Sequence, residues 1–448
     1  MSAYETWPFD LSARRSALQN ERWWSECYLP ASGLDDFQAE PDWNMIVGAA
    51  GAGKSIALEA LARYDSEKAF ILTYPPERWP GGGQEYIKGG NHLSQIMALV
   101  ANAVRDELKY DPGKLSLLSK TRLEFLRWML QKRLGERAVN RLLEEIDPQL
   151  SAPMARASYT DIYATDFTPR DMEGQIEELA DLAQALKYER VVILMDVTLT
   201  ISQDQLSGLI NLFSWLKLME HPGFAVAVAF PKVIFQRHQI GLRTRSRARI
   251  FELEWLGEQM NEIAARFLSV ATNKEVCSLE RLASPELLQR VGNWLLEEYG
   301  EPAPQGWVNL SRLLLDIFAE KNYPLGEEHF REITYRFYKE YMPLCFDLNT
   351  LQPGVWRGPR FIPLDEQPFQ FLKTLSLTHL PAASSPEKVD RALIKVAGSK
   401  GNVHTLARRA RLEVEPDLET PIYIKNTRRE GYWLEHCVNA YNASTTGV

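Results

Sequence analysis

Two patterns of apolar residues alternate along the chain and predict strands interleaved with helices. Short apolar runs, typical of strands buried on both faces of a parallel sheet, occur at 45–47, 191–195 and 224–230, and a further run at 69–74 is interrupted only by Thr73. Apolar residues at helical spacing fill the stretches 93–150, 203–219 and 258–345. We therefore expect an α/β fold with a parallel-sheet core, a helical insertion at about 93–150 and a helical region after the core.

The pattern changes again towards the C-terminus. A Pro- and Gly-bearing stretch at 351–359 predicts a connector, and a short strand followed by a helix is predicted in 361–375. Two further helices are predicted at 386–396 and 402–412, and the alternation at 421–434 predicts a β-hairpin with a polar, basic turn. These elements predict a small C-terminal domain of helices closed by a hairpin.

Length and composition are those of a multidomain globular protein. The 448 residues exceed one ordinary core, so we expect about two to four domains. Hydrophobic residues make up 45% and charged residues 25%, which argues against large-scale disorder. The formal net charge of −8 argues against a protein that coats nucleic acid non-specifically, because such binding depends on a surplus of Lys and Arg. Any nucleic-acid contact must be local.

The sequence favours a cytoplasmic protein without membrane contact. Its first residues lack the basic and apolar regions of a secretory signal, and no uncharged apolar run approaches the roughly 20 residues that cross a bilayer. The four cysteines form no Cys-x-x-Cys pair and have no nearby His at metal-ligand spacing. We expect them to be reduced thiols.

The segment from Gly48 to Ser55 reads Gly-Ala-Ala-Gly-Ala-Gly-Lys-Ser and satisfies Gly-x4-Gly-Lys-Ser/Thr in full. Its glycines let the backbone turn tightly, so that successive N–H groups converge on phosphate oxygens at the positive end of the helix that follows. Lys54 is expected to reach the β- and γ-phosphates and Ser55 to ligate Mg²⁺. The predicted nucleotide-binding residues are Gly48, Ala50, Gly51, Ala52, Gly53, Lys54, Ser55 and Ile56. The alternative is a Gly-rich turn that ends in Lys-Ser by chance.

A P-loop enzyme also needs an acid at the end of a neighbouring buried strand to hold the metal shell. Asp196 directly follows the apolar run 191–195, which places it at the carboxyl end of a predicted central strand. Ligands bind at that end of open α/β sheets. We predict that Ser55 and Asp196 hold Mg²⁺, and that Lys54 and Asp196 are the catalytic residues.

In the order of these elements the chain resembles the AAA+ and STAND branch of P-loop ATPases. The lead-in Trp7-Pro8-Phe9 and the segment 17–26 are similar to the residues that precede the cradle there, and 224–230 stands in place of the sensor-1 strand. The resemblance implies ATP in preference to GTP, a helical lid from 258 onwards and ATP-dependent self-assembly. No guanine-reading Asn-Lys-x-Asp motif is present.

The same resemblance implies two arginine roles. One is a finger that reaches a γ-phosphate, often across a subunit interface; its candidates are Arg243, Arg245, Arg247 and Arg249. The other is a lid arginine that senses the nucleotide, and Arg312 falls roughly at its position. A solvated basic loop and a surface arginine on an amphipathic helix are the alternatives.

Two departures from the family pattern bear on hydrolysis. The family places an acid at or soon after the strand-ending Asp to polarise the attacking water, whereas here the next acid is Asp204. The tip of the sensor-1 strand is Phe230-Pro231-Lys232, with no polar Asn or Thr. We therefore predict an ATPase of slow turnover that acts as a switch more than as a motor. A binder that holds nucleotide structurally is the alternative.

The C-terminal segment resembles the winged-helix output domain of OmpR-type response regulators. Its wing reads Tyr423-Ile-Lys-Asn-Thr-Arg-Arg-Glu-Gly431-Tyr432-Trp-Leu, and its third helix would be the one that reads DNA. From 391 to 412 there are six basic residues and no acid, which suits local phosphate contact. The predicted DNA-binding residues are Lys400, His404, Arg408, Arg409, Arg411, Lys425, Arg428 and Arg429. A protein-docking module is the alternative.

The expected division is lead-in helices at 1–40, a P-loop ATPase core at 41–257, a helical lid at 258–350, a winged-helix domain at 360–438 and a tail at 439–448. The first functional hypothesis is a switch that couples ATP binding and assembly to double-stranded DNA, as in regulation, transposition or defence. The second is a STAND-like signalling scaffold whose winged helix docks protein or autoinhibits. We expect either an ATP-dependent homo-oligomer or a protein partner that binds through the insertion at 93–150.

Overall fold

The structure of the chain is a computed structural model that describes residues 4–9, 21–32, 34, 43–79, 90–135, 137, 169–199, 201–214, 221–243, 248–346, 352–376, 386–427 and 431–438. The chain divides into two compact units. The sheet unit comprises Gly33–Gly48 and Lys54–Leu253. The helical unit comprises Met1–Ser32, Ala49–Gly53 and Glu254–Val448.

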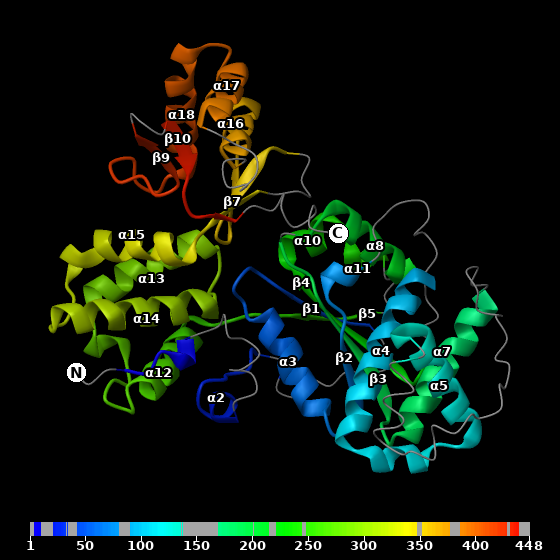
Figure 1. Cartoon of the computed structure of the whole chain (residues 1–448). Coiled ribbons are helices and arrows are strands. Elements are labelled where there is room, and N and C mark those ends of the chain that lie inside the picture. The colour runs from blue at the N-terminus through cyan, green and yellow to red at the C-terminus, as the bar shows by residue number, and fades with distance from the viewer. Residues whose placement is uncertain are drawn as a thin grey trace. The chain divides into compact units, whose positions relative to one another are not determined.

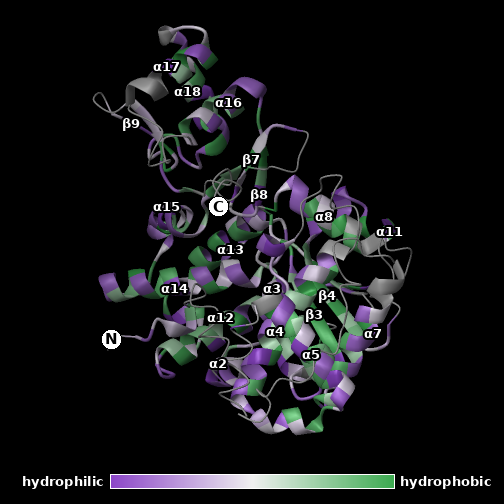
Figure 2. Ribbon diagram, turned by 45° about the vertical axis from the view of Figure 1, so that its right-hand side comes forward, coloured by the Kyte–Doolittle hydropathy of each residue, from purple (hydrophilic) through white to green (hydrophobic). Residues whose placement is uncertain are grey.

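The sheet unit is built on a parallel sheet of five strands (Figure 1). The strands are β1 (Trp43–Gly48), β2 (Ala69–Thr73), β3 (Arg190–Asp196), β4 (Phe224–Pro231) and β5 (Ala248–Glu252). Their order is β2-β3-β4-β1-β5, and every neighbouring pair is parallel. Figure 2 shows the hydrophobic colour concentrated on β3 and β4, as expected for strands covered on both faces. The predicted α/β fold class is confirmed.

Strand register brings three carboxyl ends to the same edge of the sheet. Gly48 at the end of β1 pairs with Pro231 at the end of β4, and Asp196 at the end of β3 pairs with Ala229. Helix α3 (Lys54–Asp65) begins after the short loop that follows β1. The strand ends therefore gather the backbone segments that carry the predicted site.

The described helices of the predicted insertion are part of the core of the sheet unit. They are α4 (Gly90–Tyr110), η4 (Pro112–Leu117) and α5 (Lys120–Leu134). Buried side chains of α4 and α5, such as Ile96 and Met129, belong to one hydrophobic cluster with Ile193 and Val228 of the sheet. This cluster also takes in α7 (Pro169–Ala185). The remaining stretch of the insertion, 138–150, lies outside the described residues.

Shorter helices complete the sheet unit: η2 (Pro76–Arg78), α8 (Gln203–Ser214), α10 (Lys232–Arg237) and α11 (Ile240–Arg243). A buried histidine joins three of its elements. His92 of α4 makes a 2.9 Å hydrogen bond through Nδ1 to the hydroxyl of Tyr74, just after β2, and another through Nε2 to the carbonyl of Gly208 on α8. This network fixes α4 and α8 against the edge strand.

The helical unit begins with η1 (Trp7–Phe9) and α2 (Glu21–Glu26), which pack on α12 (Gly257–Ala271). It continues with η5 (Leu279–Arg281), α13 (Pro285–Tyr299), α14 (Pro304–Lys321), η6 (Glu327–His329) and α15 (Phe330–Tyr341). Local signals set these bounds. The Ser284 hydroxyl caps α13 by accepting the N–H of Leu287, and Gly300, with φ +76°, ends it.

The stretch 351–359, which was expected to be a connector, contributes a strand to a small sheet. This stretch contains β7 (Gly354–Arg357), which lies between β6 (Leu344–Phe346) and β8 (Arg360–Pro363). The two pairings of β7 are antiparallel, and β11 (Cys437–Val438) adds a parallel fourth strand beside β6. Gly358, with φ +54°, makes the turn between β7 and β8, so a glycine that suggested a connector serves a hairpin.

The C-terminal segment folds as three helices and a hairpin, close to the bounds expected. The helices are α16 (Glu366–Ser376), α17 (Pro386–Ala397) and α18 (Lys400–Val414). Strands β9 (Ile424–Thr427) and β10 (Gly431–Leu434) pair antiparallel, with Thr427 opposite Gly431. Among the described helices of the chain, none has the length and apolarity that crossing a membrane requires.

Candidate functional site: a phosphate cradle

The loop between β1 and α3 has the tight backbone that the glycine-rich motif predicts. Gly51 and Gly53 have φ of +80° and +89°, values that side-chain-bearing residues rarely adopt. The N–H of Ala52 donates to the carbonyl of Ala49 across 3.3 Å. With Gly48 ending β1 and Lys54 beginning α3, the motif occupies a strand-to-helix turn, the setting in which it cradles phosphate.

In the sheet unit, the predicted metal-holding pair comes together. The hydroxyl of Ser55, in the first turn of α3, lies 2.6 Å from Oδ2 of Asp196 at the end of β3. Both side chains are half-buried. This distance is that of a hydrogen bond from the Ser55 hydroxyl to the carboxylate. Hydroxyl and carboxylate oxygens are of the type that Mg²⁺ takes, one or two at a time, together with phosphates and water. In the part of the chain that the structure describes, no group of three His, Cys, Asp or Glu gathers into an all-protein metal site.

Residues Ala49–Gly53 group with the helical unit, where two backbone contacts hold them. The N–H of Gln305, at the start of α14, donates to the carbonyl of Gly51 across 3.1 Å. The indole of Trp255 donates to the carbonyl of Ala52 across 2.9 Å. Both bonds use loop carbonyls, so they leave the N–H groups that would face a phosphate uninvolved in these contacts.

An acidic side chain is bound to the loop as well. The N–H of Ala49 donates to Oε1 of Glu301 across 3.3 Å, and Glu301 lies in the turn between α13 and α14. This contact places one anionic oxygen on a loop amide. No sequence motif marks Glu301 as a contact of the loop, because its Gly-Glu-Pro-Ala-Pro surroundings are typical only of a break between helices.

Gly51 is needed for a second reason, which is close packing. A Cβ built on Gly51 would lie 3.0 Å from Cε1 of Tyr299 and 3.2 Å from Cβ of Gln305. The ring of Tyr299 also packs against Gly306, where a Cβ would lie 2.9 Å from Cε2. Tyr299 is thus wedged between the phosphate loop and the first turn of α14. Burial raises the pKa of its phenol, so the ring is neutral at physiological pH.

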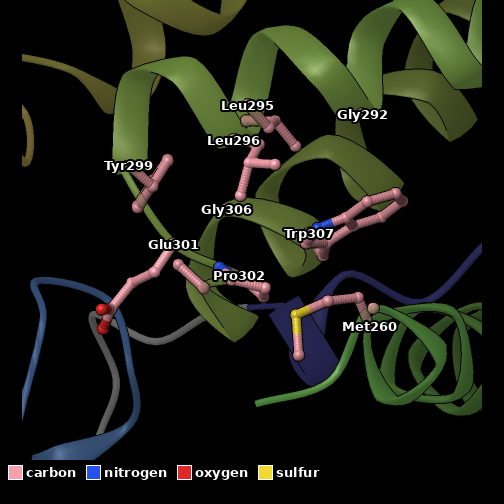
Figure 3. A pocket seen from close by; sticks show the side chains of 11 residues that line it. Met260, Gly292, Leu295, Leu296, Tyr299, Glu301, Pro302, Gly306 and Trp307 are labelled. Carbon is pink, nitrogen blue, oxygen red and sulfur yellow. The ribbon is translucent and has the colours of Figure 1, made fainter. Parts of the chain in front are cut away.

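A mostly apolar cavity of about 110 Å³ lies beside this wedge within the helical unit (Figure 3). Met260 of α12, Leu295 and Tyr299 of α13 and Trp307 of α14 contribute to its wall. In Figure 3, Glu301 extends its carboxylate away from Met260 and Trp307. Such walls suit an apolar group and not a phosphate, because charged oxygens require donors.

The arginine-finger candidates are only partly described. Arg243, at the end of α11, donates through Nε to the carbonyl of His238 across 2.9 Å. The guanidinium of Arg249, on β5, lies 5.1 Å from the ring centroid of Phe251. Arg245 and Arg247 lie outside the described residues. The finger stays a prediction.

Arg312 lies on α14, seven residues beyond Gln305. At 1.5 Å per residue, this puts it about 10 Å further along the helix axis than the contact with the phosphate loop. Its charge opposes the effect of burial on the pKa of Tyr341 in α15, so it lies near that phenol. The nucleotide-sensing role of Arg312 stays a prediction.

The basic residues predicted to contact DNA differ in what else they do. Arg411 donates through Nε and Nη2 to the carbonyl of Ile424, at 3.1 and 2.7 Å, and so joins α18 to β9. His404 makes a 2.7 Å hydrogen bond to the hydroxyl of Tyr432 on β10. Arg409 forms an exposed ion pair with Asp365.

Of the five remaining candidates, the structure describes the side chains of two. Lys425 donates to the carbonyl of Pro421 and pairs with Glu435 at 3.4 Å. Arg408 is exposed on α18. The side chain of Lys400, and the whole of Arg428 and Arg429, lie outside the described residues.

Comparison with known proteins adds structural likeness alone. No protein-family model matches the sequence, and no curated protein matches it. Among solved structures, the chain is similar to Cdc6p from Pyrobaculum aerophilum, with 10% identity over 98% of this chain and 96% of that chain and a TM-score of 0.35.

Two further solved structures are similar at the same level. One is the Aeropyrum pernix ORC1 protein in complex with DNA, with 10% identity, 100% and 98% coverage of the two chains and a TM-score of 0.39. The other is a Walker-type ATPase of Pyrococcus abyssi, with 12% identity, 97% and 95% coverage and a TM-score of 0.34. TM-scores of this size say nothing about what the present chain binds, so function must be argued from its own residues.

Proposed function

We propose that this chain is an ATP-dependent switch of AAA+/STAND type, which binds Mg-ATP in the cradle from Gly48 to Ser55 and passes the nucleotide state to a DNA-contacting winged helix. The observation that carries the first half is the 2.6 Å approach of Ser55 Oγ to Asp196 Oδ2 beside the glycine-rich loop. These two residues are far apart in sequence. A chance Gly-rich turn would not require a strand-ending acid at its hydroxyl.

Different residues of the cradle bind the phosphates and the metal ion. The N–H groups of 50, 51 and 53–56 donate to phosphate oxygens, and Lys54 places its charge on the β- and γ-phosphates. Ser55 and Asp196 supply oxygens for Mg²⁺, whose role is to neutralise charge that develops on the phosphates. Asp196 orients Ser55 by accepting its hydroxyl proton in a hydrogen bond.

The residues after Asp196 favour slow hydrolysis. Val197, the residue after Asp196, is buried, and its N–H donates to the carbonyl of Ala229. This position therefore serves the packing of the sheet and supplies no acid. Asp204, the next acid, is exposed in the first turn of α8. Because residues 197–203 include no acid that could polarise water, we expect binding and release of nucleotide to dominate over turnover.

Calorimetry on the full chain tests nucleotide binding. We expect Mg-ATP to bind wild type and to lose at least tenfold in affinity with Lys54→Ala, which removes the charge from the phosphates. Lys68, exposed in the turn after α3, gives the matched control Lys68→Ala. Wild type that takes up no Mg-ATP, or a Lys54→Ala variant that binds as tightly as the control, would refute the proposal.

Support for DNA contact comes from the local charge of the C-terminal helices. Arg391, Lys395 and Arg408 are exposed on α17 and α18, on a chain that is acidic as a whole. Concentrated positive charge on a helix suits phosphate contact. The second candidate function, a scaffold whose winged helix docks protein, is favoured by the ion pair between Arg409 and Asp365 and by the bonds of Arg411 to Ile424. In these contacts, basic groups bind partners in the same chain.

A further inference from the structure

The turn between α13 and α14 has two sides that touch different parts of the helical unit. On one side, Tyr299, Glu301 and Gln305 contact the phosphate loop. On the other side, Glu298, the residue before Tyr299, points to the C-terminal strands. A displacement of this turn must therefore be felt at both places, because the residues are consecutive on one helix end.

Glu298 takes part in a buried ionic cluster. Its two carboxylate oxygens each lie 3.1 Å from Nη2 of Arg357 on β7, and Oε1 also lies 3.1 Å from Nη1 of Arg360 on β8. The side chains of Glu298 and Arg357 are 5% and 7% exposed. Buried charges of this kind are held tightly, since either partner alone would be desolvated without compensation.

Arg357 carries the contact on to helix α18. Its Nη1 donates to the carbonyl of Val414, the last residue of α18, across 3.1 Å. The next residue, Glu415, accepts the backbone N–H groups of Ile422, Tyr423 and Ile424, which lead into the hairpin strand β9. Arg357 thus connects Glu298 to the carboxyl end of α18, and Glu415 at that end binds the start of the β9–β10 hairpin.

A nucleotide bound to the loop would change the position of Glu301. Glu301 places a carboxylate on the N–H of Ala49, and a triphosphate on the same loop would bring further negative charge beside it. Like charges at short range repel strongly where water is partly excluded. The nucleotide-bound state therefore disfavours the present position of Glu301, which is the differential interaction that a ligand needs in order to shift a conformation.

We infer that the turn from Glu298 to Gln305 reports nucleotide occupancy of the phosphate loop to the C-terminal helices through the Glu298–Arg357 ion pair. Mg-ATP displaces Glu301, the movement passes along the end of α13, and Arg357 changes its hold on the carboxyl end of α18. The inference rests on the proposed binding of Mg-ATP to the cradle. It adds the route by which that binding reaches the winged helix.

Hydrogen–deuterium exchange with and without Mg-ATP tests this route on the full chain. In wild type, we expect Mg-ATP to change exchange about fivefold or more both in 299–306 and in 354–363 and 411–424. In Glu298→Gln, which keeps the size of the side chain and removes its charge, the response in 299–306 should persist while the two distal responses are lost. Glu297→Gln alters an exposed neighbour on the same helix and should behave as wild type.

A second variant guards against simple unfolding. If Glu298→Gln fails to fold because Arg357 is left unpaired, the double variant Glu298→Leu/Arg357→Met removes both buried charges and should fold with the same loss of distal response. Distal responses that persist in a folded variant overturn the inference, as does wild type that responds at 299–306 alone. Wild type that binds no Mg-ATP by calorimetry overturns the proposed function first and this inference with it, so the two failures are distinguishable.

Discussion

The hydroxyl of Ser55 and the carboxylate of Asp196 lie 2.6 Å apart, although 141 positions separate them in the sequence. The sheet order explains the meeting. Strand β4 lies between β1 and β3, and register aligns the carboxyl ends of all three strands, so the helix after β1 starts beside the end of β3. The glycine-rich motif could occur without an acid beside Ser55, so this pair is evidence independent of the motif.

The first prediction concerns the metal dependence of nucleotide affinity. Asp196→Asn keeps the hydrogen bond from Ser55 but removes the charge that attracts Mg²⁺, so we expect Mg-ATP affinity to fall about tenfold or more, roughly 1.4 kcal/mol. Affinity for ATP in the presence of EDTA should be the same as in wild type. Titration calorimetry with and without Mg²⁺ measures both.

Asp204→Asn is the matched control, because Asp204 is exposed on α8 and takes no part in the pair. An Asp196→Asn variant with an unchanged ratio of the two affinities would remove Asp196 from the metal site.

The second prediction concerns Gly51, where a side chain meets two obstacles. In Gly51→Ala, the alanine must adopt φ +80°, and its Cβ would lie 3.0 Å from Cε1 of Tyr299. We expect a cost of about 1–3 kcal/mol in the free energy of unfolding, together with lost nucleotide affinity. Thermal or chemical unfolding followed by circular dichroism measures the first, and calorimetry the second.

Gly174 provides the comparison, since it lies within α7 and a Cβ there meets nothing within 4 Å. Gly174→Ala should stabilise by about 0.5–1 kcal/mol, because alanine favours a helix. Equal effects of the two substitutions would contradict the role assigned to the loop geometry.

The third prediction concerns pH. Burial lowers the pKa of His92 from its ordinary 6.5 to about 4. The unfolded chain then binds a proton more readily than the folded one, so stability is full above pH 6.5 and falls as the pH drops towards 4. The loss is on the order of 3 kcal/mol at the low end of this window.

Unfolding midpoints measured between pH 4 and pH 7.5 test this effect. His92→Gln can retain hydrogen bonds to Tyr74 and Gly208 without titrating, so its stability should fall less steeply through the same window. Parallel pH profiles for wild type and variant would show that another group is responsible.

The fourth prediction separates phosphate contact from structure in α18. Arg408 is exposed, so Arg408→Ala should leave the unfolding midpoint unchanged, weaken binding to duplex DNA of any sequence and reduce the salt slope by about one. Arg411 donates twice to the carbonyl of Ile424, so Arg411→Ala should lower stability.

Fluorescence anisotropy at several salt concentrations, with unfolding curves for each variant, makes the measurement. Duplex binding that Arg408→Ala leaves intact, or that is absent in wild type, would favour the protein-docking function of the C-terminal helices.

Several features followed directly from local sequence. The runs at 191–195 and 224–230 are continuous and apolar because both faces of β3 and β4 are covered, and the hairpin pattern at 421–434 matched strands β9 and β10. The stretch 351–359 was misassigned to a connector. There, the signal for the buried strand β7 is only four residues long and stands between a proline and a glycine.

The sequence by itself determined the α/β core, the glycine-rich turn between a strand and a helix, and the acid at the end of a buried strand, because each is a local pattern of residue types with a physical reason for its spacing. Only the tertiary structure decided that Glu301 binds the loop, that Tyr299 requires Gly51, and that Glu298 pairs with Arg357. A contact between distant residues leaves no trace in the periodicity of either segment. It arises when the helix turn after α13 is packed between the phosphate loop and the C-terminal strands.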